Sequence, residues 1–442
     1  MARIALIGDN SVEYINALID IWNSGDCAVL IDWRIPFKTS YQMMLEANVT
    51  KCYIDECILE KIDVCNNNAI EFISFNVASR SPRLLPYEIY SRYHNNTSLN
   101  EAVILYSSGT TGRSKGIILS HFALSTNADA ILDYMKINKN DCLFMVKSLS
   151  HSSTLTGELL TSLRSESKVV ISPTVVPPRF VLSRIEEFGV TTLCLNPTLL
   201  QMYANEYQQK HYNISTLRTI YTYGAQLNNQ TYQKVNEVFA GIEIFNGYGL
   251  SEAGPRVTSQ RKTCCNGNSA GKPIKNVEIV IVDDDGNPVR AEERGIIHVN
   301  TPSRFNGYVM GNEKHQSLYN GWLNTGDIGF IDKFGELRIV DRLDDVIINN
   351  AHKIYPSDIE RLLIENTDIS ECAVTKCAIK GEEIIGCLYV GKTEVTTDTI
   401  RELGKVLLPY EVPKRYIKVS SLPKNERGKI SKKEIERILS NE

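Results

Sequence analysis

Short apolar runs alternate with amphipathic stretches through the first half of the chain. Residues 4–7 and 28–31 are apolar and rich in β-branched side chains, and residues 12–22 between them carry apolar positions at helical spacing. This order predicts βαβ units and an α/β fold with parallel or mixed sheets. Further strands are expected at 102–106, 169–171, 192–195, 219–222 and 243–245, with helices at 180–188 and 231–239.

The pattern changes near residue 277. An apolar run at 277–282 ends in the acidic turn Asp-Asp-Asp-Gly-Asn-Pro, and a second turn at 332–336 follows another strand at 295–299. This predicts an antiparallel β subdomain over about 270–341. A third part begins after Asp341, with helices expected at 356–364 and 397–407 and strands at 371–378 and 384–390.

Composition narrows the class of protein. Of 442 residues, 43% are hydrophobic and 23% charged, and no apolar run has the ~18 residues of a membrane span. The start lacks a signal-peptide pattern, so we expect a cytoplasmic protein without a membrane span. The net charge of -4 does not favour nucleic-acid binding. Eleven cysteines without a C-x-x-C pair predict reduced thiols, and seven histidines without H-x-H or H-E-x-x-H give no zinc pattern.

A glycine- and hydroxyl-rich segment is the first candidate for chemistry. Residues 106–116 read Tyr-Ser-Ser-Gly-Thr-Thr-Gly-Arg-Ser-Lys-Gly between two apolar runs. Glycines let backbone N–H groups turn inward, and hydroxyls and a lysine donate to phosphate oxygens. The Walker A spacing is absent. Taken alone, the segment fits a solvated hairpin equally well.

Four further blocks follow in order. They are Tyr-Gly-Leu-Ser-Glu at 248–252, Thr-Gly-Asp at 325–327, Arg-Leu-Asp-Asp at 342–345 and Pro-Lys-Asn-Glu-Arg-Gly-Lys-Ile at 423–430. Together the five blocks resemble the adenylate-forming superfamily, which includes acyl-CoA synthetases, peptide-synthetase adenylation domains and luciferases. The resemblance is strongest to acyl- or aryl-CoA ligases, and it extends from the first βαβ unit to the last helix.

The resemblance implies a nucleotide site for ATP and Mg²⁺. Glu252 corresponds to the Mg²⁺ ligand, which suits a hard cation. Tyr248, with Gly249, corresponds to the aromatic residue that stacks on adenine, and Ser251 to the hydroxyl facing the α-phosphate. Asp327 corresponds to the acceptor of the ribose hydroxyls, and Arg342 to a second nucleotide contact. The loop over the β- and γ-phosphates corresponds to Ser107, Ser108, Gly109, Thr110, Thr111, Gly112 and Lys115.

The resemblance also implies a two-step reaction. A carboxylate and MgATP give an acyl-adenylate and pyrophosphate, and a thiol then displaces AMP. Lys429 corresponds to the lysine that bridges the substrate carboxylate and the α-phosphate, where an ammonium stabilises developing charge. The implied organisation is a large domain at 1–341, a hinge at 342–345 centred on Asp344, and a small lid domain at 346–442 that rotates between the steps.

The acid itself is predicted only by class. His151 stands where peptide-synthetase domains carry an aspartate that binds an α-ammonium, so an ordinary amino acid is disfavoured. With Lys429 and Glu252, His151 completes the predicted catalytic group; the alternative for this residue is a core or gating histidine. Polar side chains in this region favour a small or aromatic acid. The other predicted pocket residues are Tyr223, Gly224, Ala225, Asn246, Gly247 and Gly254.

The chain departs from the family pattern at two places, one bearing on the thiol acceptor and one on assembly with a second copy. CoA-using members place a glycine beside the pantetheine tunnel, where this chain has Ala351. The acceptor is therefore left open between CoA and the phosphopantetheine of an acyl or aryl carrier protein, whose acidic surface would suit the lysine-rich end of the chain. The chain also lacks most of the usual N-terminal segment, so one sheet edge is expected to be exposed or covered by a second copy in a homodimer.

The leading hypothesis is an AMP-forming acid–thiol ligase. Two alternatives remain. One is a nucleotide-binding homologue without turnover, against which the joint presence of the predicted magnesium ligand and the lysine argues. The other is adenylation followed by transfer to a nucleophile other than a thiol.

Overall fold

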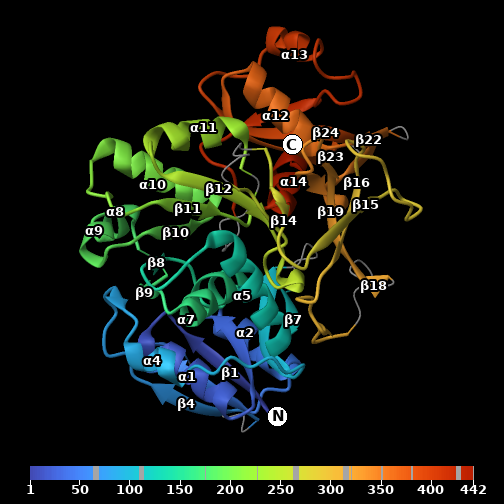
Figure 1. Ribbon diagram of the computed structural model, residues 1–442. Coiled ribbons are helices and arrows are strands. Elements are labelled where there is room, and N and C mark those ends of the chain that lie inside the picture. Colours follow the sequence, from blue (N-terminus) through green and yellow to red (C-terminus); the bar gives the residue numbers. More distant parts are fainter. Residues whose placement is uncertain are drawn as a thin grey trace. The chain divides into compact units, whose positions relative to one another are not determined.

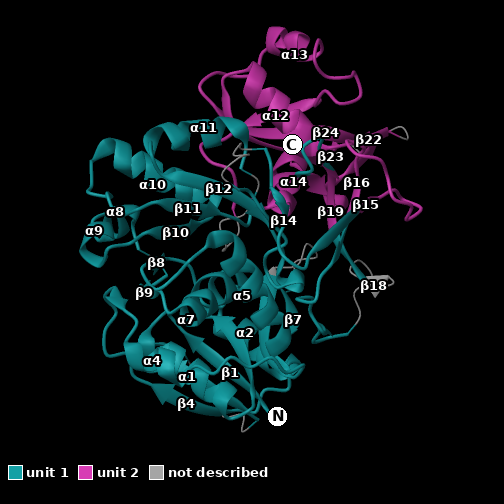
Figure 2. Ribbon diagram, in the orientation of Figure 1, with its two compact units in different colours: residues 1–280, 298–325, 331–338 teal, residues 281–297, 326–330, 339–442 magenta. Residues whose placement is uncertain are grey.

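The computed structural model describes residues 1–62, 69–108, 114–174, 176–225, 227–261, 268–311, 318–319, 321–349, 352–379, 382–424 and 430–441. The chain forms two compact units, shown in different colours in Figure 2. Unit 1 comprises Met1–Val280, His298–Thr325 and Ile331–Arg338. Unit 2 comprises Ile281–Ile297, Gly326–Phe330 and Ile339–Glu442.

The first sheet of unit 1 has the strand order β17-β7-β6-β2-β1-β3-β4. Its strands β1, β4 and β7 are labelled in Figure 1. β1 pairs in parallel with β2 and β3, and α1 (Val12–Asn23) connects β1 to β2. The helix begins where the Ser11 hydroxyl accepts a hydrogen bond from the Tyr14 N–H at 3.0 Å. The predicted βαβ unit is therefore confirmed. The strands are β1 (Arg3–Gly8), β2 (Cys27–Asp32), β3 (Lys51–Asp55), β4 (Glu71–Phe75), β6 (Glu101–Ser108), β7 (Ser114–Ser120) and β17 (Gly307–Tyr308).

The second sheet of unit 1 has the order β14-β13-β12-β11-β10-β8-β9-β5. The strands β9, β8, β10, β11 and β12 run parallel, so their carboxyl ends meet at one edge. In open α/β sheets this edge is where ligands bind. The strands are β5 (Arg83–Leu84), β8 (Cys142–Met145), β9 (Lys168–Ile171), β10 (Thr192–Leu195), β11 (Thr219–Thr222), β12 (Glu243–Tyr248), β13 (Thr258–Ser259) and β14 (Lys272–Pro273).

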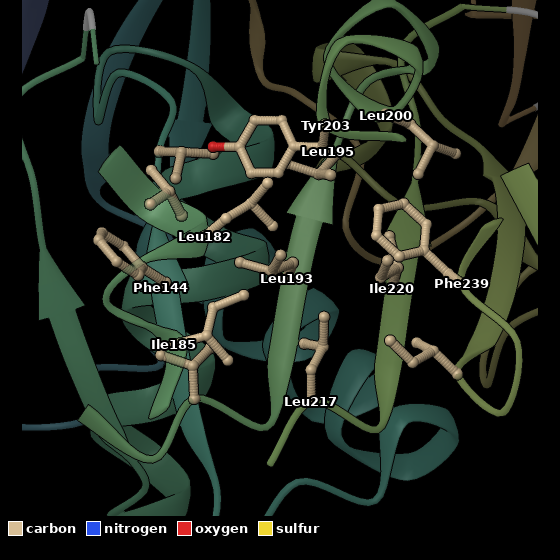
Figure 3. Packing of buried hydrophobic residues seen from close by; sticks show 14 of the residues in the cluster. Phe144, Leu182, Ile185, Leu193, Leu195, Leu200, Tyr203, Leu217, Ile220 and Phe239 are labelled. Carbon is tan, nitrogen blue, oxygen red and sulfur yellow. The ribbon is translucent and has the colours of Figure 1, made fainter. Parts of the chain in front are cut away.

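A large apolar core holds helices against the second sheet. Leu193 of β10 and Ile220 of β11 pack with Leu182, Ile185 and Phe239 from the covering segments (Figure 3). All five side chains are at most 2% exposed. Burial of this kind stabilises a fold by roughly 1.5–3 kcal/mol for each large apolar side chain. The rigid sheet fixes where each strand ends and therefore where the site residues begin.

The single helix expected at 180–188 is replaced by two. α8 (Pro178–Leu182) ends at Ser183, whose hydroxyl donates a hydrogen bond to the Phe180 carbonyl at 2.9 Å, and α9 (Ile185–Phe188) follows. A serine that bonds the backbone locally competes with continuation of the helix. The remaining helices of unit 1 are α2 (Phe37–Glu46), α3 (Glu56–Leu59), α4 (Tyr87–Arg92), α5 (His121–Met135), α6 (Ser152–Thr154), the π-helix η1 (Leu155–Leu160), α7 (Thr161–Ser165), α10 (Pro197–Gln209), α11 (Asn229–Val238) and the 3-10 helix η2 (Ser251–Ala253).

A third sheet, of order β15-β16-β19-β18 with β20 beside β19, contains the strands predicted near 277–299. The turn at 332–336 connects β19 to β20, as predicted, and the Asp332 carboxylate accepts hydrogen bonds from the backbone N–H groups of Phe334 and Glu336 at 2.9 Å. The strands are β15 (Glu278–Val282), β16 (Gly295–Asn300), β18 (Leu318–Tyr319), β19 (Trp322–Ile331) and β20 (Leu337–Arg342).

The C-terminal part of unit 2 is an α+β structure. The hairpin of β23 (Ile369–Ile379) and β24 (Glu382–Gly391) is extended by β25 (Arg415–Lys418), which runs parallel to β24. The predicted helix at 397–407 is shorter than expected, because α13 (Thr397–Leu403) ends at Gly404. The other elements are η3 (Leu343–Asp345), β21 (Ile347–Asn349), β22 (His352–Ile354), α12 (Pro356–Asn366) and α14 (Lys432–Ser440).

Two further features concern the whole described chain. All eight cysteines within the described ranges are free thiols. Among the described helices, none combines the length and the apolar character needed to cross a bilayer.

Candidate active site

The β6–β7 hairpin carries the predicted phosphate loop. Ser107 of β6 lies directly opposite Lys115 of β7 in the antiparallel register, and Ser108 lies opposite Ser114. The residues between, including the predicted Gly109, Thr110, Thr111 and Gly112, lie outside the described residues. The structure therefore places the two ends of the predicted loop on paired strands.

The segment after β12 forms a tight turn into η2. Tyr248 is the last residue of β12. A Cβ on Gly249 would lie 1.8 Å from the Pro255 carbonyl oxygen, so only glycine permits this approach. The Ser251 hydroxyl lies 2.8 Å from that of Ser152, which follows His151 in the chain. Two predicted blocks, one near 151 and one near 251, are thus brought together.

Glu252 is the buried carboxylate of this turn. Its side chain belongs to a residue only 7% exposed, and its Oε1 accepts a hydrogen bond from the Tyr308 hydroxyl at 3.0 Å. The Lys115 ammonium lies 5.6 Å from the centre of the Tyr308 ring. Tyr308 thus joins the phosphate-loop hairpin to the predicted magnesium ligand. Tyr308 was not predicted from the sequence, because nothing in the surrounding Phe-Asn-Gly-Tyr marks it as a partner of a residue 56 positions away.

The buried carboxylate of Glu252 is a ligand of the kind that Mg²⁺ prefers. No cationic side chain within the described ranges forms an ion pair with Glu252, so its buried charge lacks a protein counter-ion. The same ranges hold no group of three or more potential metal-ligating His, Cys, Asp or Glu side chains. A single carboxylate is what Mg²⁺ needs when substrate phosphates and water supply its other ligands.

His151 lies beside an ion pair whose carboxylate, that of Asp32, is buried. Its Nε2 is 4.0 Å from Oδ2 of Asp32, at the carboxyl end of β2. Arg34 donates to Asp32 through Nε at 2.8 Å and Nη2 at 2.5 Å. Burial acts to raise the pKa of Asp32, but the Arg34 hydrogen bonds and charge outweigh it and hold that pKa below its usual value. No motif in the sequence predicted this Asp32–Arg34 pair beside His151.

The predicted pocket residue Tyr223 is buried in a polar and aromatic cluster. Its hydroxyl lies 2.7 Å from that of Tyr134, and the Arg256 guanidinium carbon lies 3.5 Å from the centre of its ring. A Cβ on Gly247 would lie 2.3 Å from the Tyr223 ring, so Gly247 leaves room for that ring. Burial raises the pKa of Tyr223 well above its ordinary value, which keeps the phenol neutral. Arg256 was not among the predicted pocket residues.

The other predicted pocket residues differ in position. Gly224 and Ala225 follow Tyr223 and are exposed. Asn246 is buried, its amide nitrogen donates to the Ser269 carbonyl at 2.8 Å, and its amide oxygen has no partner among the described residues. A Cβ on Gly254 would lie 2.7 Å from the Ser303 carbonyl oxygen, so backbone packing also accounts for this glycine.

Unit 2 holds the remaining predicted nucleotide residues. Asp327 of β19 is 5% exposed and forms an ion pair with Arg342 at the end of β20, with Oδ1 2.9 Å from Nη1. Asp344 lies in η3, directly after this pair. Lys429 and Ala351 lie outside the described residues. The structure therefore brings Asp327 and Arg342 together.

Comparisons with known protein sequences find two matching family models and several relatives. Residues 2–309 match the sequence model of the AMP-binding enzymes, and residues 358–429 match that of the AMP-binding enzyme C-terminal domain. Relatives include the 4-coumarate–CoA ligase of Vanilla planifolia, 27% identical over 99% of this chain and 84% of the relative. The 4-coumarate–CoA ligase 2 of Petroselinum crispum is 27% identical over 98% of this chain and 83% of its own.

Solved structures share the fold. ATP-bound MatB from Rhodopseudomonas palustris has a TM-score of 0.86 at 22% identity, covering 99% of this chain and 88% of that one. The anthranilate CoA ligase AuaEII in complex with anthranoyl-AMP has a TM-score of 0.84 at 22% identity, covering 99% of this chain and 87% of that one. These neighbours confirm the α/β architecture predicted from the sequence.

Proposed function

The chain belongs to the family of AMP-binding enzymes, and on this premise we propose that it is an AMP-forming acid–thiol ligase. A carboxylate oxygen of the substrate attacks the α-phosphorus of ATP, forming the acyl-adenylate and releasing pyrophosphate. A thiol sulfur then attacks the acyl carbon, forming a thioester and releasing AMP. The printed activities of the curated relatives support this reaction class.

The proposal depends on one observation, the contact of Glu252 with Tyr308, whose ring lies near Lys115. A buried carboxylate with no counter-ion among the described residues lies beside the β6–β7 hairpin, whose strands flank the predicted phosphate loop. We assign Glu252 to Mg²⁺, which would neutralise charge on the phosphates. Lys115 and the loop hydroxyls would bind the β- and γ-phosphates, and Tyr248 would stack on adenine.

Unit 2 would contribute the ribose contact and the mobile lysine. In this proposal Asp327 accepts hydrogen bonds from the ribose hydroxyls, and Arg342, which already pairs with it, holds the carboxylate in place. Lys429 stabilises charge on the α-phosphate during adenylate formation. The segment 342–345 acts as the hinge, with 346–442 as the lid that excludes water from the adenylate.

The acid and the acceptor are proposed by class. The acid is small or aromatic, because the candidate wall combines Tyr223 with the buried amide of Asn246. We propose CoA as the thiol, since the relatives act as CoA ligases by name. A carrier-protein phosphopantetheine remains the alternative that Ala351 suggested.

The test is pyrophosphate release with MgATP across a panel of carboxylic acids. Lys429→Ala is expected to lower the rate with the best acid by about 100-fold or more, because one fixed charge at the transition state is lost. ATP binding, measured by calorimetry, is expected to change little. Lys433→Ala, an exposed neighbour, is the matched control.

Two results would contradict the proposal. A normal rate for Lys429→Ala would remove the role of this lysine. ATP binding by the wild type without pyrophosphate release from any acid would identify a nucleotide-binding protein without turnover. Supplying CoA and a phosphopantetheinylated carrier protein separately, followed by intact-mass analysis, distinguishes the acceptors.

A further inference from the structure

Arg256 is a buried cation that the proposed reaction does not use. The residue is 2% exposed, and its guanidinium stacks on the ring of Tyr223. Gly157 of the π-helix η1 lies against it, since a Cβ there would be 2.8 Å from Nη2. The Nε and Nη2 atoms are buried and have no hydrogen-bond partner among the described residues. An arginine in this state leaves donors unsatisfied, which is costly.

The Nε and Nη2 atoms of Arg256 form the edge of the guanidinium that commonly donates two parallel hydrogen bonds to a carboxylate. Elsewhere in this chain, Arg34 presents its Nε and Nη2 to the two oxygens of Asp32. Arg3 presents the same two nitrogens to the two oxygens of Glu101, at 2.9 and 2.8 Å. A planar fork of two N–H groups matches a carboxylate in geometry and charge. In Arg256 no carboxylate of the described residues hydrogen-bonds to this edge.

The surrounding charges do not balance Arg256. The carboxylate that acts on it is Glu158, whose Oε1 lies 3.1 Å from the ammonium of Lys147. Burial raises the pKa of Glu158, which weakens it further as a counter-ion. The neighbouring phenols of Tyr134 and Tyr223 also have raised pKa values, first because of burial, so they remain neutral. The cluster therefore holds two cations and at most one anion.

We propose that Arg256 binds a second anionic group at the far end of the acid substrate, so that the enzyme activates dicarboxylic acids. The inference rests on the proposed function. Arg256 stacks on Tyr223, a residue assigned to the acyl pocket from the sequence, and this places the cation at that wall. The second carboxylate satisfies Nε and Nη2 together and neutralises the buried charge. Its reacting partner carboxylate remains free to attack ATP.

The experiment compares each dicarboxylic acid with its own monoamide, which has nearly the same shape but no second charge. Succinate, glutarate, adipate and terephthalate, each with its monoamide, span a range of lengths. The readout is kcat/KM for pyrophosphate release with saturating MgATP and CoA. For the best-fitting pair, the wild type is expected to prefer the diacid by about 100-fold, the scale of a charge-assisted pair in a buried site.

Variants assign the preference to Arg256. Arg256→Met is expected to abolish the preference for the diacid, while Arg256→Lys is expected to retain part of it as a point charge. Arg184→Met is the control, since Arg184 forms an ion pair with the neighbouring exposed Glu187 and lies over the ring of Phe180. The wild-type comparison needs no variant, so it stands even if Arg256→Met fails to fold.

The outcomes separate the two proposals. If monocarboxylic acids or monoamides release pyrophosphate and no diacid is preferred, the inference is wrong and the proposed function stands. If Arg256→Met folds and keeps the diacid preference, another group binds the second charge and the inference is again wrong. If no acid of any class releases pyrophosphate, the proposed function fails and the inference fails with it.

Discussion

At the scale of single residues, the site is built from pairs that are distant in sequence. Glu252 accepts from Tyr308, His151 lies beside Asp32, and Arg256 stacks on Tyr223. Glu252 and His151 were predicted as site residues from their motifs, but Tyr308 and Asp32 were not. A local motif carries no information on which distant side chain will contact it.

Tyr308 gives a prediction on magnesium affinity. Tyr308→Phe removes the hydroxyl that orients Glu252 but leaves the ring in place. We expect the Mg²⁺ concentration for half-maximal pyrophosphate release to rise about 10-fold, the usual effect of losing a hydrogen bond to a metal ligand. Tyr90→Phe, which removes a hydroxyl bonded to the Ser167 carbonyl, is the control. An unchanged Mg²⁺ dependence would show that Glu252 needs no help from Tyr308.

At the scale of elements, strands were predicted more reliably than helices. The strands at 192–195 and 219–222 have the expected bounds, since short buried runs between polar segments are distinctive. The helix expected at 180–188 is instead α8 and α9, because helical spacing continues across a break made by local hydrogen bonds. The spacing of apolar residues indicates which face of a segment is buried. It does not show whether every backbone hydrogen bond in that segment is helical.

The turn from β12 into η2 gives a prediction on a single methyl group. In Gly249→Ala the new Cβ would lie 1.8 Å from the Pro255 carbonyl oxygen, so the backbone between Tyr248 and Glu252 must shift. We expect pyrophosphate release to fall at least about 10-fold, because small misplacements of catalytic groups are costly. Gly404→Ala, whose Cβ meets only ordinary contacts, is expected to retain activity. Full activity in Gly249→Ala would contradict the role of this turn.

At the scale of the whole molecule, the proposed lid contains a lysine, Lys432, whose charge interacts with the carboxylates at the hinge. Lys432 of α14 donates to the Val374 carbonyl at 3.0 Å and lies 3.3 Å from Glu360 of α12. Burial lowers the pKa of Lys432, but the charges of Glu360, Asp345 and Asp341 outweigh it and raise that pKa overall. Lys432 of α14 therefore contacts α12 and β23 within unit 2, and its charge interacts with that of the hinge residue Asp345.

Lys432→Met is expected to destabilise unit 2 by about 1–2 kcal/mol, since it leaves carboxylates facing one another. The effect should grow with pH. Burial raises the pKa of Asp345, and an acid with a raised folded-state pKa loses its contribution to stability as pH rises through that value. The pH window therefore opens above 3.8, the ordinary pKa of an aspartate. Urea unfolding at about pH 4 and pH 7 measures this, with exposed Lys433→Met as the control. A loss of stability that is smaller at the higher pH would contradict the arrangement.

The sequence by itself determined the α/β class, most strand positions, the order of the motifs and the identity of Glu252, Tyr248, Asp327 and Arg342 as candidates. These depend on local periodicity and on the chemistry of short segments. Only the tertiary structure decided which side chains meet: Tyr308 with Glu252, Asp32 with His151, and Arg256 with Tyr223. Contacts of this kind depend on the path of the whole chain. The unbalanced charge of Arg256 became visible only from the neighbours of that buried side chain among the described residues.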